Sequence, residues 1–144
     1  MKILLVDDSI GNVSSLEKVL SEAGHTVVRT WDPEEAKMIC LSDGFDVIIA
    51  SIICGQVDGV SLCIECKRSA RLPLVTVLCS PYEMKEEDVD FLGQIGIDQV
   101  LQSCGAEELS ELVGFLFENP SPREVCSDFD GCRLMSIVRR CYDA

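Results

Sequence analysis

The chain has 144 residues, a net charge of -13 and a hydrophobic fraction of 47%. This length suits one domain, which can bury a core without a metal or a disulfide. The negative charge would on average repel DNA, RNA or an anionic membrane, so we expect neither nucleic-acid nor membrane binding. The apolar runs are too short for a membrane span or a signal peptide, which predicts a cytoplasmic protein.

Strand and helix patterns alternate five times along the first 118 residues. Short apolar or β-branched runs predict strands over Lys2–Val6, Thr26–Thr30, Phe45–Ser51, Pro73–Cys79 and Asp98–Gln102. Helical spacing of apolar residues predicts helices over Ser9–Ala23, Asp32–Leu41, Asp58–Ala70, Met84–Gly93 and Gly105–Phe117. Such alternation is typical of parallel strands joined by right-handed helical crossovers.

The alternating pattern stops at residues 119–122, which read Asn-Pro-Ser-Pro. We therefore predict a domain over residues 1–118 and a C-terminal extension over 119–144. Leu134, Ile137 and Val138 form an apolar stripe flanked by arginines, which indicates a short helix. Because a helix of that length is marginal alone, it should dock on the domain, dock on a partner or continue into further chain.

The chain is organised around the apolar run Val47–Ala50, which fits a strand covered on both faces. Ser51 follows this run directly. In an open parallel sheet, ligand chemistry lies at the carboxyl ends of the strands. Ser51 therefore stands where a functional residue is expected, and Asp7 and Asp8 follow the first strand in the same way.

The order of elements, together with Asp7-Asp8, Asp58-Gly59, Pro73 and Gly96, resembles the receiver domain of two-component response regulators, the CheY-like family. The resemblance implies a flavodoxin-like, doubly wound α/β fold with five strands in the order 2-1-3-4-5, five helices and, here, a C-terminal tail. It also implies an acidic pocket that binds Mg²⁺. In such a pocket an aspartate at the end of strand three takes a phosphoryl group from a histidine kinase.

Only half of that site is present when the resemblance is carried over residue by residue. Asp7 and Asp8 match the metal-binding acids. The other family positions hold different residues: Ser51 for the phosphoacceptor aspartate, Ser103 for the lysine, Leu78 for the Thr/Ser switch and Val100 for the aromatic switch. A shift of one residue in strand four would place Cys79 at the switch position.

These replacements point to a pseudo-receiver, which keeps the fold but has lost phosphoryl transfer. An acyl phosphate needs a carboxylate nucleophile, and a serine hydroxyl without a base is a poor substitute. Without the lysine, the developing charge also lacks its cation. We expect no enzymatic activity and at most weak Mg²⁺ binding by Asp7 and Asp8, which could equally serve only to cap the first helix.

The predicted function is therefore two-component signalling through protein contacts without aspartyl phosphorylation. The resemblance implies a contact face made of Lys85–Gly93, Asp98–Gln102 and Glu107–Phe117. It implies a histidine kinase, another receiver or an output domain as the partner, and it makes a homodimer an expectation.

Two alternatives belong to other classes. One is a phosphorylatable receiver that uses an atypical acceptor such as Asp58, although its place just before the third helix argues against this role. The other is a thiol or metal sensor, because the chain has nine cysteines and a C-x-x-C formed by Cys63 and Cys66. Since this motif lies inside a predicted helix, buried packing thiols are the simpler interpretation.

Overall fold

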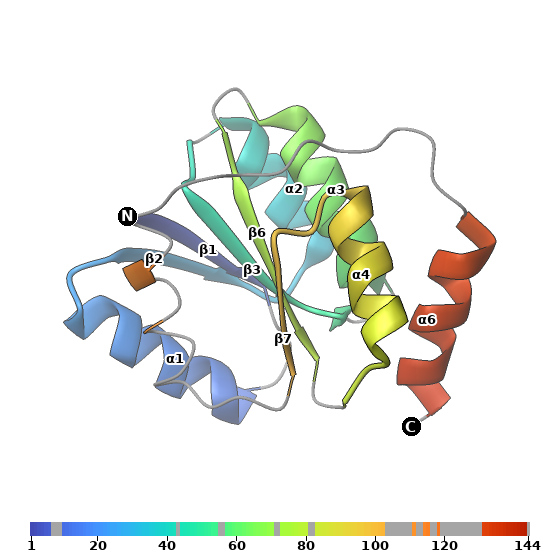
Figure 1. The fold of residues 1–144 in the computed structure, drawn as a ribbon. Coiled ribbons are helices and arrows are strands. Elements are labelled where there is room, and N and C mark those ends of the chain that lie inside the picture. The colour runs from blue at the N-terminus through green and yellow to red at the C-terminus, as the bar shows by residue number, and fades with distance from the viewer. Residues whose placement is uncertain are drawn as a thin grey trace.

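Five parallel strands form one sheet in the computed structural model, in the order β2-β1-β3-β6-β7 (Figure 1). Their bounds are Lys2–Val6 for β1, Thr26–Thr30 for β2, Val47–Ser51 for β3, Val75–Ser80 for β6 and Gln99–Gln102 for β7. Numbered along the chain, the five sheet strands follow the order 2-1-3-4-5. The predicted doubly wound, flavodoxin-like topology is therefore confirmed.

The structure describes residues 1–6, 10–42, 44–54, 57–70, 73–80, 83–102, 111, 114–115, 118 and 131–143. The side chains of residues 10–15, 53, 54, 57 and 141–143 are outside this description. Asp7, Asp8, Ser103 and most of the helix predicted over Gly105–Phe117 therefore lie outside the described residues.

Helices cover both faces of the sheet (Figure 1). Their bounds are Ile10–Glu22 for α1, Pro33–Ser42 for α2, Gly59–Ser69 for α3, Glu86–Ile95 for α4 and Gly131–Asp143 for α6. Helix α1 lies on one face, and α2, α3 and α4 lie on the other. Within the described chain, no helix combines the length and the apolarity needed to cross a bilayer.

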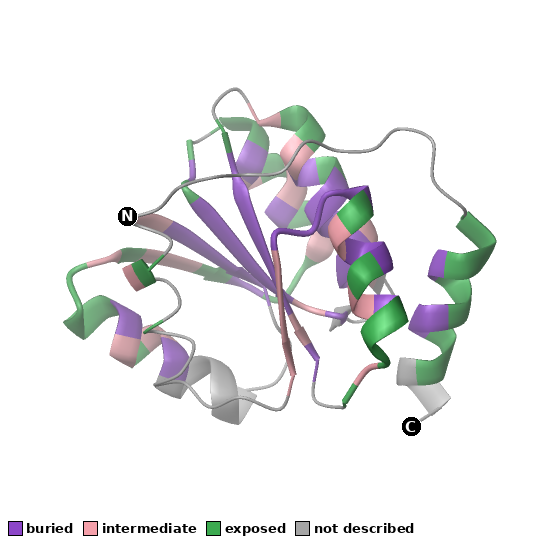
Figure 2. Cartoon of the chain, viewed as in Figure 1, coloured by how far each residue is buried: buried purple, intermediate pink, exposed green. Residues whose placement is uncertain are grey.

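Two buried clusters fill the space between the sheet and these helices, and the central strands β1, β3 and β6 are the most continuously buried elements (Figure 2). Successive residues of a strand point to opposite faces of the sheet. Leu4 and Val6 accordingly join the cluster under α2, α3 and α4, whereas Ile3 and Leu5 join the cluster under α1. The near-continuous apolar runs of the central strands follow from this coverage on both sides.

A buried ion pair ties α3 to the amino edge of the sheet. Lys67 Nζ lies 2.6 Å from Asp98 Oδ2 and also donates to the Gly96 carbonyl at 2.9 Å. The backbone N–H of Thr76 donates to the same Asp98 oxygen at 2.8 Å, and the Asp98 N–H donates to Thr76 Oγ1 at 3.1 Å. The side chains of Lys67 and Asp98 are only 7% and 5% exposed, so each charge depends on the other for compensation.

A short antiparallel hairpin, formed by β4 (Ile53–Cys54) and β5 (Val57–Asp58), interrupts the connection between β3 and α3. The sequence patterns predict no strand between Ser51 and the helix that begins at Asp58, so this hairpin is not predicted. Two-residue strands carry too few residues to show a period of two, so no alternation marks them. The hairpin returns the chain to the end of β3 before α3 begins.

Helix α6 docks on the domain, alongside α4 (Figure 1). Leu134, Ile137 and Val138 are 5%, 1% and 2% exposed and belong to the cluster under α2, α3 and α4. The apolar stripe seen in the sequence is thus the face that α6 buries. Of the three fates predicted for the extension, docking on the domain is the one observed.

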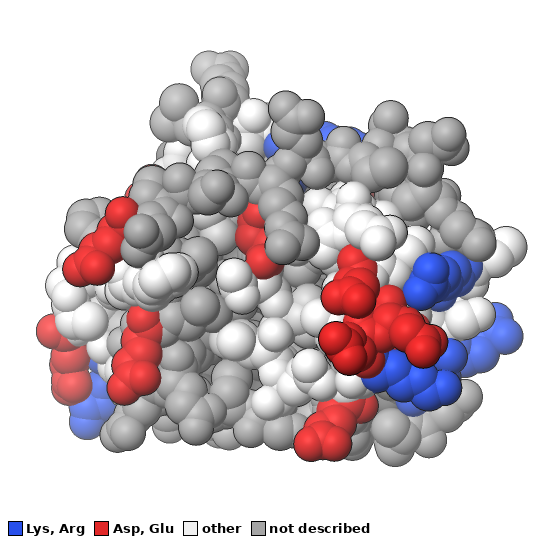
Figure 3. Space-filling model, in the orientation of Figure 1, with Lys and Arg blue, Asp and Glu red and all other residues white. Residues whose placement is uncertain are grey.

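Arginine side chains anchor α6 to an acidic helix. Arg140 Nη2 lies 2.6 Å from Asp88 Oδ2, and the Arg133 guanidinium lies 4.6 Å from the centre of the Phe91 ring. Arg133 also donates to the Glu87 carbonyl at 3.2 Å. Figure 3 shows the basic side chains of α6 beside the acidic side chains of α4. Helix α6 therefore covers the side of α4 that carries Asp88 and Phe91.

An Arg140→Leu substitution should weaken this docking modestly, because the Asp88 carboxylate, only 12% exposed, would lose its cation. We expect a loss of about 1 kcal/mol in the free energy of unfolding, measured by urea denaturation. Arg139→Leu, at an exposed position of the same helix, is the matched control and should change stability by less than about 0.5 kcal/mol. Equal effects of both substitutions would contradict the assigned role of Arg140.

Candidate functional site

Ser51 ends β3 at the carboxyl edge of the sheet, where it is partly exposed. It pairs in register with Cys79 of β6, and Cys79 pairs with Leu101 of β7. Because paired residues of parallel strands point to the same face, Ser51 and Cys79 are neighbours on one face of this edge. Leu78 instead pairs with Ala50 and is fully buried on the opposite face.

The hairpin folds the chain back tightly against Ser51. The Ile52 N–H donates to the Cys79 carbonyl at 2.8 Å, and the Gly59 N–H donates to the Ile52 carbonyl at 2.8 Å. A Cβ atom at position 59 would lie only 1.8 Å from the Ser51 carbonyl oxygen. Glycine is therefore required at position 59 because a neighbouring backbone occupies the space of any side chain.

Asp58 is the N-cap of α3. Its Oδ1 accepts a hydrogen bond from the Ser61 N–H at 2.7 Å, and its backbone is extended, with φ -76° and ψ 142°. This arrangement satisfies one of the free N–H groups of the first helical turn. The carboxylate that could have served as an atypical phosphoacceptor thus already has a structural role.

Replacing Asp58 with alanine should cost about 1 kcal/mol of unfolding free energy, because the cap hydrogen bond is lost. Asp58→Asn keeps a capping oxygen and should stay close to the wild type. Thermal or urea unfolding of the two variants measures the difference. If asparagine were as destabilising as alanine, the carboxylate charge, and not the cap, would be the property that matters.

No histidine serves this edge as a base for Ser51. The single histidine of the chain, His25, precedes β2 at the opposite edge, where its Nδ1 lies 3.3 Å from the N-terminal nitrogen. Burial and the positive charge of the N-terminus both lower the pKa of His25. Lys67 also lies at the amino edge of the sheet, where it is paired with Asp98. It therefore cannot replace the lysine that the resemblance places at position 103.

Among the described residues, the carboxyl edge of the sheet offers few donors for a cation. Ser51 contributes a hydroxyl where the resemblance expects a carboxylate. In the part of the chain that the structure describes, no three His, Cys, Asp or Glu side chains are grouped so that they could hold a metal ion. Asp7 and Asp8, the acids that the resemblance assigns to Mg²⁺, lie outside the described residues, so Mg²⁺ binding by them stays a prediction.

No protein family model matches the chain. Among curated proteins, it is 34% identical over 74 residues to the probable transcriptional regulator ycf27 of Guillardia theta, a match that covers 51% of the chain and 29% of that protein. It is 26% identical over 139 residues to the alkaline phosphatase synthesis transcriptional regulatory protein PhoP of Bacillus subtilis, covering 96% of the chain and 49% of that protein. The chain thus spans at most about half the length of the curated relatives it matches.

Solved structures give the fold directly. A two-component response regulator from Clostridium difficile superposes with a TM-score of 0.74 and 24% identity, over 84% of this chain and 98% of that one. The chain has the receiver-domain fold. The receiver domain of the sensor histidine kinase PA1611 from Pseudomonas aeruginosa, solved with a magnesium ion coordinated in its active site cleft, matches with a TM-score of 0.69 and 21% identity, over 82% and 98%.

Within the receiver fold, the structure brings together only some of the predicted site residues. Ser51 lies at the end of the third sheet strand, as the sequence pattern predicts. Its neighbour on the next strand is Cys79, the alternative obtained by a shift of one residue, whereas Leu78 is a core residue. Val100 pairs with Leu78 and is partly exposed beside α4.

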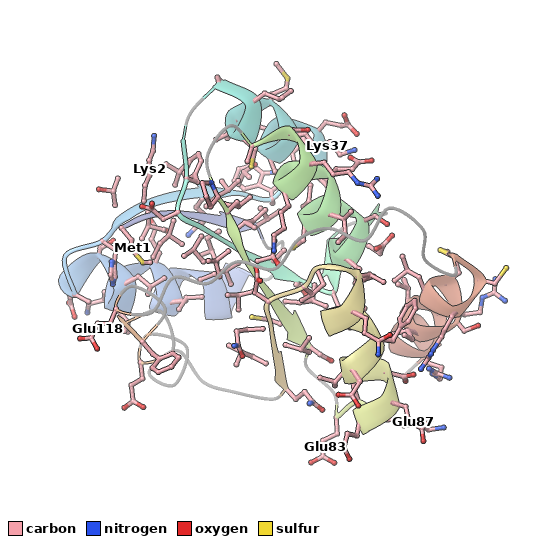
Figure 4. The ribbon with its side chains drawn as sticks, turned by 45° about the horizontal axis from the view of Figure 1, so that its top comes forward. Met1, Lys2, Lys37, Glu83, Glu87 and Glu118 are labelled. Carbon is pink, nitrogen blue, oxygen red and sulfur yellow. The ribbon has the colours of Figure 1, made fainter. Side chains whose placement is uncertain are left out.

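The predicted contact face of the receiver fold is partly covered. Asp88 and Phe91 of α4 face α6. The other side of α4 borders a groove of about 430 Å³ between α4 and β7, whose lining includes Val89, Asp90 and Val100. At the amino end of α4, Glu83 and Glu87 point outward (Figure 4). The Gln102 side chain accepts from the Met84 N–H at 2.6 Å and so ties the end of β7 to this region.

Sequence reasoning missed the link between α6 and α4 and the pairing of Lys67 with Asp98. A signal for the first existed, since the arginine-flanked stripe of the tail complements the acidic segment that forms α4. The sequence contains no comparable signal for the pairing of Lys67 with Asp98, because a lysine near the end of a predicted helix is usually exposed to solvent.

Proposed function

We propose that this chain is a receiver-like module of two-component signalling that acts through protein contacts and forms no aspartyl phosphate. The receiver fold and the partial match to transcriptional regulators support the signalling role. The proposed loss of phosphoryl transfer rests mainly on the residue at one position. A serine hydroxyl, and not a carboxylate, ends β3 and lies next to Cys79.

The chemistry follows from that position. Transfer to a carboxylate gives an acyl phosphate, whereas transfer to a serine gives a phosphate ester and needs a base to remove the hydroxyl proton. His25 lies at the opposite edge of the sheet and cannot act as that base. Asp58, the remaining acid of the β3–α3 connection, is bound to the first turn of α3. On this account the module has no enzymatic activity.

Magnesium is a minor part of the proposal. The PA1611 receiver domain, which has a similar structure, holds a magnesium ion in its active site cleft. In this chain the acceptor carboxylate is missing, and Mg²⁺ sites in proteins rely on one or two carboxylates together with phosphate oxygens. We therefore propose that Asp7 and Asp8 give at most weak Mg²⁺ binding.

The partner is a protein: a histidine kinase, another receiver or an output domain. Because α6 occupies one side of α4, we propose that the partner, or a second copy of the chain, engages the side of α4 that faces β7. The surplus of acidic over basic residues favours a partner with a basic surface and disfavours nucleic acid. The expectation of a cytoplasmic location stays a prediction.

A titration with beryllofluoride and Mg²⁺, followed by NMR, tests the loss of the phosphoacceptor. Beryllofluoride mimics an acyl phosphate only where a carboxylate and a metal meet. We expect no specific chemical-shift changes at Ser51, Cys79 or the residues of β7, while a conventional receiver domain titrated in parallel responds. A saturable response centred on the β3–α3 connection would instead favour the atypical acceptor.

A further inference from the structure

The contacts of α6 have the pattern of an amphipathic helix bound in a groove. Its buried residues Leu134, Ile137 and Val138 are spaced i, i+3 and i+4, which is the spacing by which such helices anchor in apolar grooves. Met135 and Arg139, on the other side of the helix, are exposed. One apolar stripe, and not burial on all sides, therefore holds α6 in place.

Two arginines of α6, one at each end of the stripe, contact specific groups of α4. Arg133 lies 4.6 Å from the centre of the Phe91 ring and donates to the Glu87 carbonyl at 3.2 Å. Arg140 Nη2 lies 2.6 Å from Asp88 Oδ2. The acidic side chains at the start of α4 add a general attraction for a basic helix (Figure 3). This surface therefore recognises an apolar stripe flanked by arginines.

The surface under α6 also includes the hairpin that follows Ser51. The backbone of α6 approaches β4, the first strand of this hairpin, while its side chains contact α4. The docked helix thus lies against the segment that connects the end of β3 to α3. Replacing or removing the helix at this surface would change the packing of the hairpin next to Ser51.

Helix α6 depends on the surface for its own stability, because an isolated helix of its length is marginal in water. The chain tethers it through residues 119–130, which gives it a high effective concentration at the surface. A competing helix must therefore make additional contacts. The groove on the other side of α4, lined in part by Val89, Asp90 and Val100, is a place where a larger partner can make them.

We propose that the surface formed by α4 and the hairpin is a docking site for a basic amphipathic helix, and that α6 is its resident occupant. A partner protein that presents a helix of the same chemistry, an apolar stripe flanked by arginines, binds there by displacing α6. The intact chain is thus self-inhibited at this site. The inference does not rest on the loss of phosphorylation, and it concerns the side of α4 that faces away from β7.

The first test asks whether α6 leaves the surface while the domain stays folded. Native-state hydrogen exchange of the full chain, followed by NMR, measures the opening of each element. We expect the amides of α6 to exchange about a hundredfold faster than those of β1 and β3, because α6 opens alone whereas central strands open only on global unfolding. Exchange of α6 at the rate of these strands would overturn the proposal, since α6 would then be a fixed part of the core.

The second test supplies the docking helix as a separate molecule. The probe is a fluorescent peptide of residues 131–144 with both of its cysteines replaced by serine, and anisotropy measures its binding to the full chain. In the chain, Ile137→Asp puts a charge at a position only 1% exposed and should release the resident helix, so the peptide should bind about tenfold more tightly than to the wild type. Met135→Asp, at a position of α6 that is 51% exposed, is the matched control and should leave the affinity unchanged.

Asp88 shows where the peptide binds. Adding Asp88→Asn to the Ile137→Asp chain should weaken peptide binding about tenfold, because Arg140 of the peptide loses its carboxylate. Binding that is insensitive to Asp88→Asn would overturn the proposal, and so would a folded Ile137→Asp chain that binds the peptide no better than the wild type. If circular dichroism shows that Ile137→Asp unfolds the domain, the exchange measurement on the wild type decides.

Discussion

A Lys67→Met variant should lose about 3–5 kcal/mol of unfolding free energy, the largest effect expected of any single substitution considered for this protein. Methionine keeps much of the length of the lysine side chain but removes its charge. The Asp98 carboxylate, 5% exposed, would then be left without its cation. The Gly96 carbonyl would also lose the hydrogen bond that Lys67 Nζ donates at 2.9 Å.

The loss should appear as a melting temperature lower by about 10–20 °C, measured by circular dichroism. Lys37→Met is the matched control, because Lys37 pairs with Glu65 at a similar distance of 2.8 Å but at the surface. With lysine and glutamate side chains 30% and 52% exposed, that pair should contribute less than about 1 kcal/mol. Equal losses in the two variants would show that Asp98 is compensated by other groups.

A Gly59→Ala variant should lose about 3 kcal/mol, because its methyl group would lie 1.8 Å from the Ser51 carbonyl oxygen. The Ser51 carbonyl oxygen belongs to the backbone and cannot move aside as the end of a flexible side chain could. The hairpin or the start of α3 must therefore shift. The shift should also break the hydrogen bond from the Gly59 N–H to the Ile52 carbonyl. Urea denaturation measures the loss, and amide chemical shifts of Ser51 and Ile52 report the displacement.

Gly131→Ala provides the comparison for the previous variant. A Cβ at position 131 meets nothing within 4 Å, and the residue begins α6. Alanine there should be neutral or stabilise the protein by up to about 1 kcal/mol. If Gly59→Ala were as well tolerated as Gly131→Ala, the close approach between position 59 and Ser51 would not exist in solution.

Much of the fold follows from local sequence patterns. The apolar runs of β1, β3 and β6 are long enough to predict strands covered on both faces, and their alternation with helical stripes predicts parallel pairing. The helix and strand bounds differ from the predicted ones by up to two residues, as at α4, predicted over Met84–Gly93 and observed over Glu86–Ile95. Helix ends depend on capping contacts that a hydrophobic pattern does not encode.

Features set by contacts between distant residues could not be predicted in this way. The pairing of Ser51 with Cys79 depends on strand register, and a shift of one residue exchanges the two faces of a strand. For Asp7, Asp8 and Ser103, which lie outside the described residues, the roles implied by the receiver resemblance stay predictions.

Intact-mass analysis after incubation with acetyl phosphate and Mg²⁺ tests the central claim most directly, with a conventional receiver domain as the positive control. Because Ser51 offers a hydroxyl and Asp58 caps α3, we predict that the mass of this protein stays unchanged while that of the control rises by one phosphoryl group. A phosphoryl adduct that hydroxylamine removes, mapped to any aspartate of this chain, would contradict the account.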